Sequence, residues 1–275
     1  MRIGIDYKKY LRLDKFPHIW CVGCGNGTVM KAVIKAIDNL QLDKNEVVIV
    51  SGIGCSSRAT GYLDFNTLHT THGRALPFAT GVKFSKPRLK VIVISGDGDC
   101  MAIGGNHFMH ACRRNIDMTL VMINNGIYGM TGGQYSPATN YMEYGTTAPY
   151  GNIEQDSDNT AIAMACGASY VARSTTYHVA QLEKLITDGI QHKGFSVIEA
   201  IAQCPHHYGR KNKKGDGPAM VRQYKENAVP FSRAQNMSEE ELKGKIVTGK
   251  FLQKESPEYC ESYARLVLRA QGKEE

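Results

Sequence analysis

The chain has 275 residues, 42% of them hydrophobic, and a formal net charge of +7, so it is long enough to bury a sizeable core in one large domain or two small ones. It has no run of about 18 apolar residues and no opening charged-then-apolar signal segment, which predicts a cytoplasmic protein without a membrane span. Positive charge concentrates between Pro205 and Lys225, but no recognition motif accompanies it, which argues against nucleic-acid binding.

The amino-terminal part begins with an arm. Residues 1–20 mix charged and aromatic side chains and end in Trp20, the only tryptophan, which predicts an arm that packs on another surface, such as a partner. Cys21 and Cys24 follow as a Cys-x-x-Cys pair among glycines, a spacing that brings two thiolates close enough to hold one metal centre. Residues 28–40 then carry apolar side chains on one helical face, which predicts a helix that packs on a sheet.

The next segments predict further sheet elements. Residues 47–50 are expected to form a buried strand, and a glycine-rich turn with Cys55 and Arg58 follows it. A polar loop at residues 70–74 contains His72, and residues 75–82 should start a helix. These strand ends and loops are where parallel sheets place functional groups.

The stretch Val91–Gln134 organises the whole chain. An apolar run ends in Ser-Gly-Asp-Gly-Asp at residues 95–99, a helical pattern continues to Asn115, and a second apolar run ends in Asn-Asn-Gly at 124–126. Short β-branched runs with a helix between them predict a βαβ unit, whose two strand ends meet at the carboxyl edge of one sheet. Asp97 and Asn125 would therefore lie close together, and their hard oxygens suit Mg²⁺ beside phosphate. The glycines and the helix start suit a phosphate group.

The remaining segments complete an α/β pattern. Residues 135–158 predict a long functional loop, 160–166 and 179–190 helices, and 169–172 and 195–201 strands, the last of which delivers Cys204 to the same edge. From His206 the chain becomes basic and turn-rich, and one helix is expected at 257–270. We therefore predict a domain at residues 1–205, with a mostly parallel sheet and helices on both faces, and an extension at 206–275 that wraps a partner.

Four of the eight cysteines form a candidate metal centre. Cys21, Cys24, Cys55 and Cys204 would converge from three segments on one sheet edge, and a set of four thiolates suits a [4Fe–4S] cluster or zinc. Scattered buried thiols are the alternative from spacing alone. The other cysteines, at 100, 112, 166 and 260, are interpreted as small core residues.

These motifs resemble those of thiamine diphosphate (TPP) enzymes, and more closely the β subunit of 2-oxoacid:ferredoxin oxidoreductases. The resemblance covers roughly residues 18–210 and rests on CxxCG, IGCSS, HGRA, GDGD, NNxIYGMTGGQ and the Cys-Pro at 204–205. It departs from the family pattern at Val22, where proline is common, and at Pro137-Ala138-Thr139. The implied fold is the TPP-binding α/β fold with a C-terminal extension.

The resemblance implies specific roles for the site residues. Asp97, Asn125 and the carbonyl of Ile127 would hold Mg²⁺, and the four cysteines a [4Fe–4S] cluster. His72 would stand near the cofactor, although it would otherwise serve to fix its turn. His107 and His110 are expected to pack rather than to bind metal. The residues expected to contact TPP are Ile53, Gly54, Cys55, Ser56, Gly96, Gly98, Asp99, Gly129 and Met130.

The implied activity is the TPP- and coenzyme A-dependent oxidative decarboxylation of a 2-oxoacid, with electrons passing to ferredoxin. The chain shows only the diphosphate-binding half of a TPP site, so the pyrimidine half should lie on an α subunit, in an (αβ)₂ assembly that is compatible with further small subunits. Residues 210–214 are a solvated basic loop or a receiver for acidic ferredoxin. A cluster-free TPP decarboxylase or ligase and a zinc-binding interaction module are the alternative classes.

Arg58 decides the expected substrate. A guanidinium near the cofactor would bind the second carboxylate of 2-oxoglutarate, which favours that substrate over pyruvate or branched-chain 2-oxoacids. Neutralising the cluster or the diphosphate is its alternative role.

Overall fold

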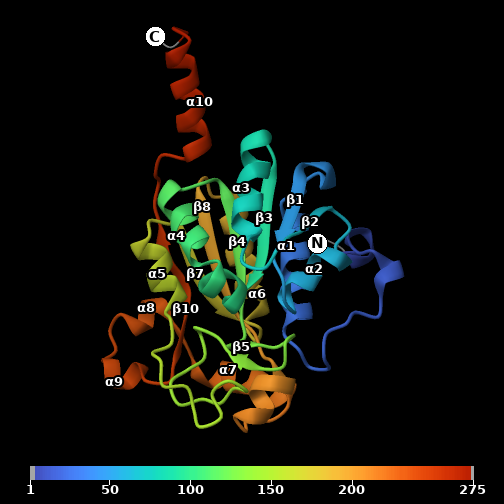
Figure 1. Cartoon of the computed structure of the whole chain (residues 1–275), viewed down its shortest axis with the longest axis vertical. Coiled ribbons are helices and arrows are strands. Elements are labelled where there is room, and N and C mark those ends of the chain that lie inside the picture. Colours follow the sequence, from blue (N-terminus) through green and yellow to red (C-terminus); the bar gives the residue numbers. More distant parts are fainter. Residues whose placement is uncertain (1–3, 274–275) are drawn as a thin grey trace.

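Figure 1 shows the computed structural model of the chain, which describes residues 4–273. The described residues form one eight-stranded sheet with the order β2-β1-β3-β4-β8-β7-β10-β9 and a separate two-stranded ribbon, β5-β6. The strands are β1 (Val47–Ser51), β2 (Asn66–His69), β3 (Lys90–Gly96), β4 (Met118–Asn124), β5 (Ile127–Tyr128), β6 (Gln134–Tyr135), β7 (Tyr170–Thr175), β8 (Phe195–Ile201), β9 (Ala228–Pro230) and β10 (Ile246–Gln253).

The sheet is parallel from β2 to β7, and only β10 runs antiparallel to its neighbour β7. The predicted βαβ unit is present as β3, a π-helical turn η5 (Gly98–Ile103), α4 (Gly105–Arg114) and β4. The long helices are α1 (Asn26–Asn39), α3 (Ala75–Ser85), α6 (Val179–Gln191), α7 (Gly217–Asn227) and α10 (Tyr259–Ala270), and the short ones are α2 (Ala59–Tyr62), α5 (Asn159–Ala165), α8 (Phe231–Ala234) and α9 (Glu239–Leu242).

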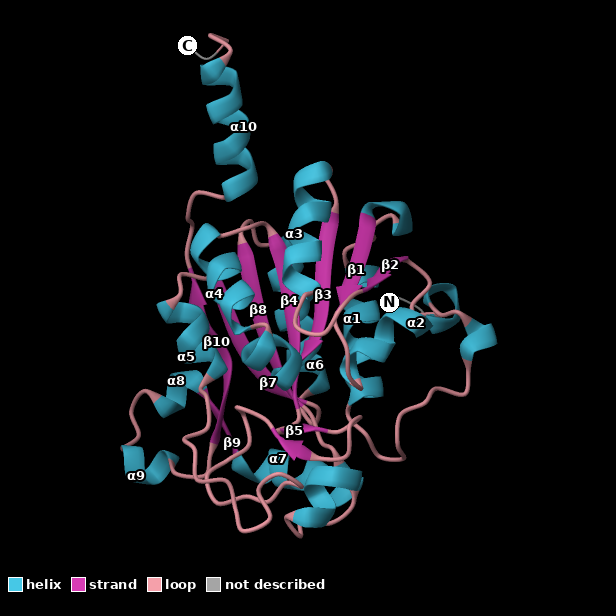
Figure 2. Cartoon of the chain, viewed as in Figure 1, coloured by secondary structure: helices cyan, strands magenta, loops and turns pink. Residues whose placement is uncertain are grey.

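Helices cover both faces of the sheet, as Figure 2 shows and as the sequence predicted. Successive side chains of a strand point to opposite faces. Ile92 and Ile94 of β3 accordingly join the core under α1 and α6, while Val91 and Val93 join the core under α3 and α4. Burial on both faces explains why these strands are continuous apolar runs.

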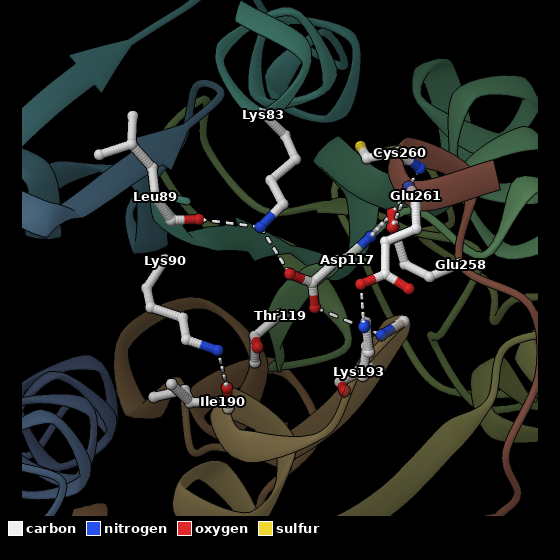
Figure 3. A network of polar contacts seen from close by, with 12 residues as sticks. Lys83, Leu89, Lys90, Asp117, Thr119, Ile190, Lys193, Glu258, Cys260 and Glu261 are labelled. Carbon is white, nitrogen blue, oxygen red and sulfur yellow. Dashed lines mark hydrogen bonds and ion pairs between the residues drawn. The ribbon is translucent and has the colours of Figure 1, made fainter. Parts of the chain in front are cut away.

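A polar network closes the amino edge of the sheet (Figure 3). Lys83 of α3 is 2% exposed, and its Nζ lies 3.0 Å from the Leu89 carbonyl and 2.5 Å from Asp117 Oδ2. The carboxylate of Glu258 accepts from the backbone N–H of Asp117 at 3.1 Å and of Glu261 at 2.9 Å, which joins the start of α10 to the start of β4. These contacts tie α3 and the start of α10 to the residues that precede β3 and β4.

The amino-terminal arm packs on its own chain. The Arg12 guanidinium donates to the carbonyls of Thr60 and Phe65 at 3.0 and 2.9 Å. Trp20 is buried and its Nε1 donates to the Cys55 carbonyl at 2.6 Å. The described part of the arm thus supports the turn after β1, because its aromatic side chains find their apolar surface on α2.

Residues 206–275 contribute more regular structure than the single helix predicted there. That helix is present as α10, but β10 also pairs with β7, and β9 pairs with β10, so the segment extends the main sheet. Beyond residue 260 every described side chain is exposed, and α10 projects from the body in Figure 1. Within residues 4–273, no helix combines the length and apolar character that crossing a membrane requires.

Candidate active site at the carboxyl edge of the sheet

Two cavities lie next to each other where β1, β3, β4 and β8 end. The first, called here the Asp97 cavity, has a volume of about 160 Å³. Its lining includes every residue expected to bind TPP or Mg²⁺ together with His72: Ile53, Gly54, Cys55, Ser56, His72, Gly96, Asp97, Gly98, Asp99, Asn125, Ile127, Gly129 and Met130. The parallel register brings these residues together, since each strand of the βαβ unit ends at this edge.

Asp97 is a buried carboxylate prepared for a cation. Its side chain is 2% exposed, it accepts a short hydrogen bond from the Ser136 hydroxyl, and the backbone N–H of Asn125 lies 3.5 Å from its Oδ1. Burial raises the pKa of Asp97 to about 6, and the Ser136 bond opposes that rise. A carboxylate beside an amide oxygen and a backbone carbonyl is a donor set that fits Mg²⁺ with phosphate and water.

The two asparagines that follow β4 have different roles. Asn124 turns back into the fold, where its Nδ2 donates to buried Glu199 at 2.8 Å. Asn125 lines the cavity, and its Oδ1 accepts from the backbone N–H of Ile127 at 3.2 Å, which holds the turn. The doublet therefore combines one structural anchor with one residue that faces the site.

Asp99 organises the loops around the cavity rather than presenting free oxygens to it. Its Oδ1 lies 2.6 Å from His72 Nδ1 and 2.7 Å from the backbone nitrogen of Gly73, and its Oδ2 accepts from the Ser95 hydroxyl at 2.6 Å. A Cβ at Gly52 would stand 2.1 Å from Asp99 Oδ2, so only glycine fits there. Asp99 thus joins the turns after β1 and β2 to the end of β3.

Tyr128 is a site residue that the sequence analysis did not single out. Its hydroxyl donates to the Gly98 carbonyl at 3.1 Å, and its ring meets the His72 ring edge-on at 6.1 Å. A Cβ on Gly98 would lie 2.3 Å from that ring, so the glycine and the tyrosine fit each other. Its position two residues after Asn-Asn-Gly, at the end of β4, could have identified Tyr128 as a site residue. Ser136, which bonds Asp97 from within the long loop, gave no signal.

The second cavity, called here the four-cysteine cavity, has a volume of about 270 Å³, and Cys21, Cys24, Cys55 and Cys204 all line it. Trp20, Asn26, His206 and His207 belong to the same lining. Sequence reasoning missed these four, although each stands within three residues of a predicted ligand. Within residues 4–273, no group of three or more His, Cys, Asp or Glu side chains converges tightly enough on one point to hold a single ion. The thiols surround a volume instead.

Burial disfavours free thiolates in this cavity. Burial, with a smaller contribution from neighbouring thiolates, raises the pKa of Cys24 to about 12 and that of Cys55 to about 11. Burial also raises the pKa of Cys204. Backbone N–H groups of Asn26 and of His206 and His207 oppose this by donating to Cys24 and Cys204. A bound metal centre would stabilise the thiolate form of these side chains, as it does in iron–sulfur clusters.

The two cavities share a wall. Cys55, Asn125, Gly129 and Met130 line both of them. A Cβ on Gly129 would lie 3.4 Å from Cys55 Sγ and 3.7 Å from Cys204 Sγ, so the backbone of residue 129 passes directly beside two thiols. The arrangement can place an oxygen-bound cofactor and a thiol-bound redox centre within electron-transfer distance.

The remaining predicted residues lie elsewhere. Arg58 is exposed in the turn η4 (Ser56–Arg58) and lines neither cavity, although its charge lowers the pKa of Cys55. His107 and His110 lie on α4 outside both cavities. Cys100, Cys112 and Cys260 are buried in the hydrophobic core, and Cys166 packs against it, as predicted.

Comparisons with known proteins agree with this geometry. Residues 52–200 match the family described as thiamine pyrophosphate enzyme, C-terminal TPP binding domain. The 2-oxoglutarate synthase subunit KorB of Methanocaldococcus jannaschii is 54% identical over 259 residues, which are 94% of this chain and 96% of that protein. The KorB subunit of Archaeoglobus fulgidus is 48% identical and covers 98% of each chain. The similarity therefore includes the C-terminal segment, which the motif-based resemblance at residues 18–210 had left out.

A solved structure is similar over nearly the whole fold. It is the 2-oxoglutarate:ferredoxin oxidoreductase from Magnetococcus marinus with 2-oxoglutarate, coenzyme A and succinyl-CoA bound. It superposes with a TM-score of 0.87 at 32% identity and covers 98% of this chain and 91% of that chain.

Proposed function

This chain belongs to the family of 2-oxoacid:ferredoxin oxidoreductase β subunits, and we propose that it is the β subunit of a 2-oxoglutarate:ferredoxin oxidoreductase. The reaction converts 2-oxoglutarate and coenzyme A into succinyl-CoA and CO₂, and two electrons leave to ferredoxin with release of one proton. The observation that carries the proposal is the wall of Cys55, Asn125, Gly129 and Met130, shared by an oxygen-lined cavity and a four-thiol cavity. A cytoplasmic enzyme is in keeping with the eight free thiols.

The Asp97 cavity is the proposed site of Mg²⁺ and TPP. Asp97, Asn125 and the carbonyl of Ile127 hold the ion, while Gly96, Gly98 and the start of η5 leave room for the diphosphate. The remaining expected contacts come from Ile53, Gly54, Cys55, Ser56, Gly129 and Met130. When bound, TPP supplies the nucleophilic carbon and the electron sink for decarboxylation. The protein supplies the orientation and a water-poor surround for it.

His72 is the proposed proton-handling residue of this chain. In the neutral imidazole, donation of Nδ1–H to the Asp99 carboxylate leaves Nε2 as the nitrogen that is able to accept and return a proton. Asp99 is therefore a positioning residue that fixes the tautomer and the ring orientation of His72. Asp99 also accepts from the backbone N–H of Gly73, so one carboxylate holds both the histidine and the turn that follows it.

The four-cysteine cavity is the proposed site of a [4Fe–4S] cluster, with Cys21, Cys24, Cys55 and Cys204 as ligands. Such a cluster supplies one-electron transfer when bound. Cys55 and Gly129 give the short path from one cavity to the other. Cys21 is exposed beside Val22, which is 99% exposed, so the opposite side of the cavity reaches the surface.

The proposal requires two partners. An α subunit carries the pyrimidine-binding half of the TPP site, in an (αβ)₂ assembly that is compatible with further small subunits. Ferredoxin meets the exposed side of the four-cysteine cavity, where Arg210, Lys211 and Lys213 follow Cys204 and are exposed. Their positive charge would steer an acidic electron carrier to the cluster.

Anaerobic co-purification of the chain with its α subunit, followed by iron, magnesium and thiamine analysis and by assay with 2-oxoglutarate, tests the proposal. We expect a brown complex that bleaches with dithionite, contains TPP and reduces ferredoxin only when coenzyme A is present. The chain alone should release no CO₂ from any 2-oxoacid. A colourless protein with one zinc, or coenzyme A-independent turnover without iron, would contradict it.

A further inference from the structure

Asn26 is a buried amide whose side chain has no partner. It is the first residue of α1 and is 1% exposed, yet within residues 4–273 neither its Nδ2 nor its Oδ1 makes a hydrogen bond. Leaving a buried amide unpaired is expensive, and native proteins leave few such groups. It needs an explanation in terms of a group that the amide contacts in the loaded protein.

The position of Asn26 identifies that group. The side chain lines the four-cysteine cavity, and its residue follows Cys24 by two positions. The backbone N–H of Asn26 already donates to Cys24. The helix itself does not use the amide, since Gly25 occupies the N-cap and no side-chain cap bond is present. Ser57, the other such buried residue in the described part of the chain, lines neither cavity, so among residues 4–273 only Asn26 combines both properties.

We propose that the Asn26 amide donates a hydrogen bond from Nδ2 to a sulfur atom of the iron–sulfur cluster and thereby raises its reduction potential. The inference rests on the proposed function, because it needs the cluster in the four-cysteine cavity. Hydrogen bonds to cluster sulfurs are among the factors that set the potential. The N–H dipole stabilises the extra negative charge that the cluster carries after it accepts one electron, so the reduced form gains more than the oxidised form.

The test is a redox titration of the reconstituted holoenzyme, followed by visible absorption and EPR, with Asn26→Leu, Asn26→Asp and Asn39→Leu. Asn26→Leu removes the donor while keeping the branched side-chain shape and the number of heavy atoms. Asn26→Asp keeps the size but replaces the donor with an acceptor. Asn39→Leu makes the same leucine substitution at the other end of α1, where the amide donates to Glu183 at 2.8 Å.

We expect the ratio of reduced to oxidised cluster at a fixed potential to fall about tenfold in Asn26→Leu, which equals ~59 mV for a one-electron couple. The fall should be larger in Asn26→Asp and absent in Asn39→Leu. An unchanged midpoint potential in Asn26→Leu at full iron content overturns the inference. If neither Asn26 variant keeps its cluster, the test is made on wild-type enzyme that contains asparagine labelled with ¹⁵N at the side-chain amide.

In the labelled wild type, pulsed EPR of the reduced cluster should show a ¹⁵N coupling. Its absence overturns the inference. Asn125 lines the same cavity and would also carry the label, so the measurement is repeated in Asn125→Asp. If the ¹⁵N coupling disappears in that variant, it arises from Asn125, and this result also overturns the inference. Failure of the proposed function has a separate signature, which is a wild-type complex without iron. Such a complex overturns both.

Discussion

Asp99 Oδ1 lies 2.6 Å from His72 Nδ1, and the same oxygen lies 2.7 Å from the Gly73 backbone nitrogen. Both side chains line the Asp97 cavity, but the Asp99 carboxylate is 3% exposed and its oxygens are held by His72, Gly73 and Ser95. We propose that the second aspartate of the Gly-Asp-Gly-Asp sequence acts through His72, while the first holds the cation. Two carboxylates separated by one glycine thus have different roles, and each can be tested separately.

Asp99→Asn should lower kcat by about two orders of magnitude or more, because an amide at this position no longer selects the Nδ1–H tautomer of His72. TPP content should remain near wild type. Steady-state kinetics of the αβ complex measures the effect. The control is a double-mutant cycle that combines Asp99→Asn with His72→Ala. Because the two residues act as one unit, the double variant should be no slower than His72→Ala alone. Additive losses would separate Asp99 from His72.

Asp97→Asn should abolish Mg²⁺-dependent TPP binding but stabilise the empty chain near pH 7.5. Burial raises the pKa of Asp97 from 3.8 to about 6, so above pH 6 the folded protein carries a buried charge that the unfolded chain would solvate. The carboxyl stabilises the fold fully below its unfolded pKa, and this contribution is lost as pH rises through 6. The gain in the variant should be at most ~3 kcal/mol at pH 7.5, should fall to roughly half of that at pH 5, and should disappear only below the unfolded pKa of 3.8.

Thermal unfolding of metal-free protein at both pH values measures this gain. Added Mg²⁺ and TPP should raise the Tm of wild type, because ligand binding to the folded state stabilises it, and should leave the variant unchanged. Equal ligand-induced shifts in the two proteins would show that Asp97 does not hold the ion.

Cys204→Ala should lose iron or sharply lower cluster occupancy, because it removes one of the four proposed thiolate ligands. Cys112→Ala is the matched control, since Cys112 is 0% exposed and lies in the core away from the four-cysteine cavity. Its iron content should be that of wild type, with a small loss of stability from the missing sulfur. Iron analysis and visible spectra after anaerobic purification measure both. The same iron content in the two variants would refute the ligand assignment.

Arg58→Ala should lower kcat/KM selectively for 2-oxoglutarate, by ~2–3 kcal/mol relative to 2-oxobutyrate, because a charged hydrogen-bond pair to the distal carboxylate is lost. Arg58 is exposed in this chain and lines neither cavity, so its contact with substrate requires a site completed by the α subunit. The measurement is steady-state kinetics of the complex with both substrates. Equal losses for the two would assign Arg58 to the cofactor or the cluster instead.

The sequence alone was sufficient for the fold class and for the residues gathered at the carboxyl edge. The apolar runs that became β3, β4 and β8 are buried on both faces, so their composition is distinctive, and parallel strands must end at one edge. The strand ends then identify Asp97, Asn125 and Cys204 as neighbours without any coordinates. The family resemblance added the roles of these residues and further contacts, such as Gly129, Met130 and the Ile127 carbonyl, that the strand pattern had not located.

Tertiary structure decided the contacts between segments distant in sequence. β10 was not predicted, because Ile246–Gln253 mixes polar and apolar residues around Gly249 and becomes a strand through pairing with β7. The same applies to Ser136 on Asp97 and to the engagement of both Asp99 oxygens by His72, Gly73 and Ser95. Local sequence determines which residues favour strands and turns, whereas the partner of a buried polar atom depends on which distant segment folds against it. Asn26 shows this most clearly, because only the folded structure places its unpartnered amide in the lining of the four-cysteine cavity.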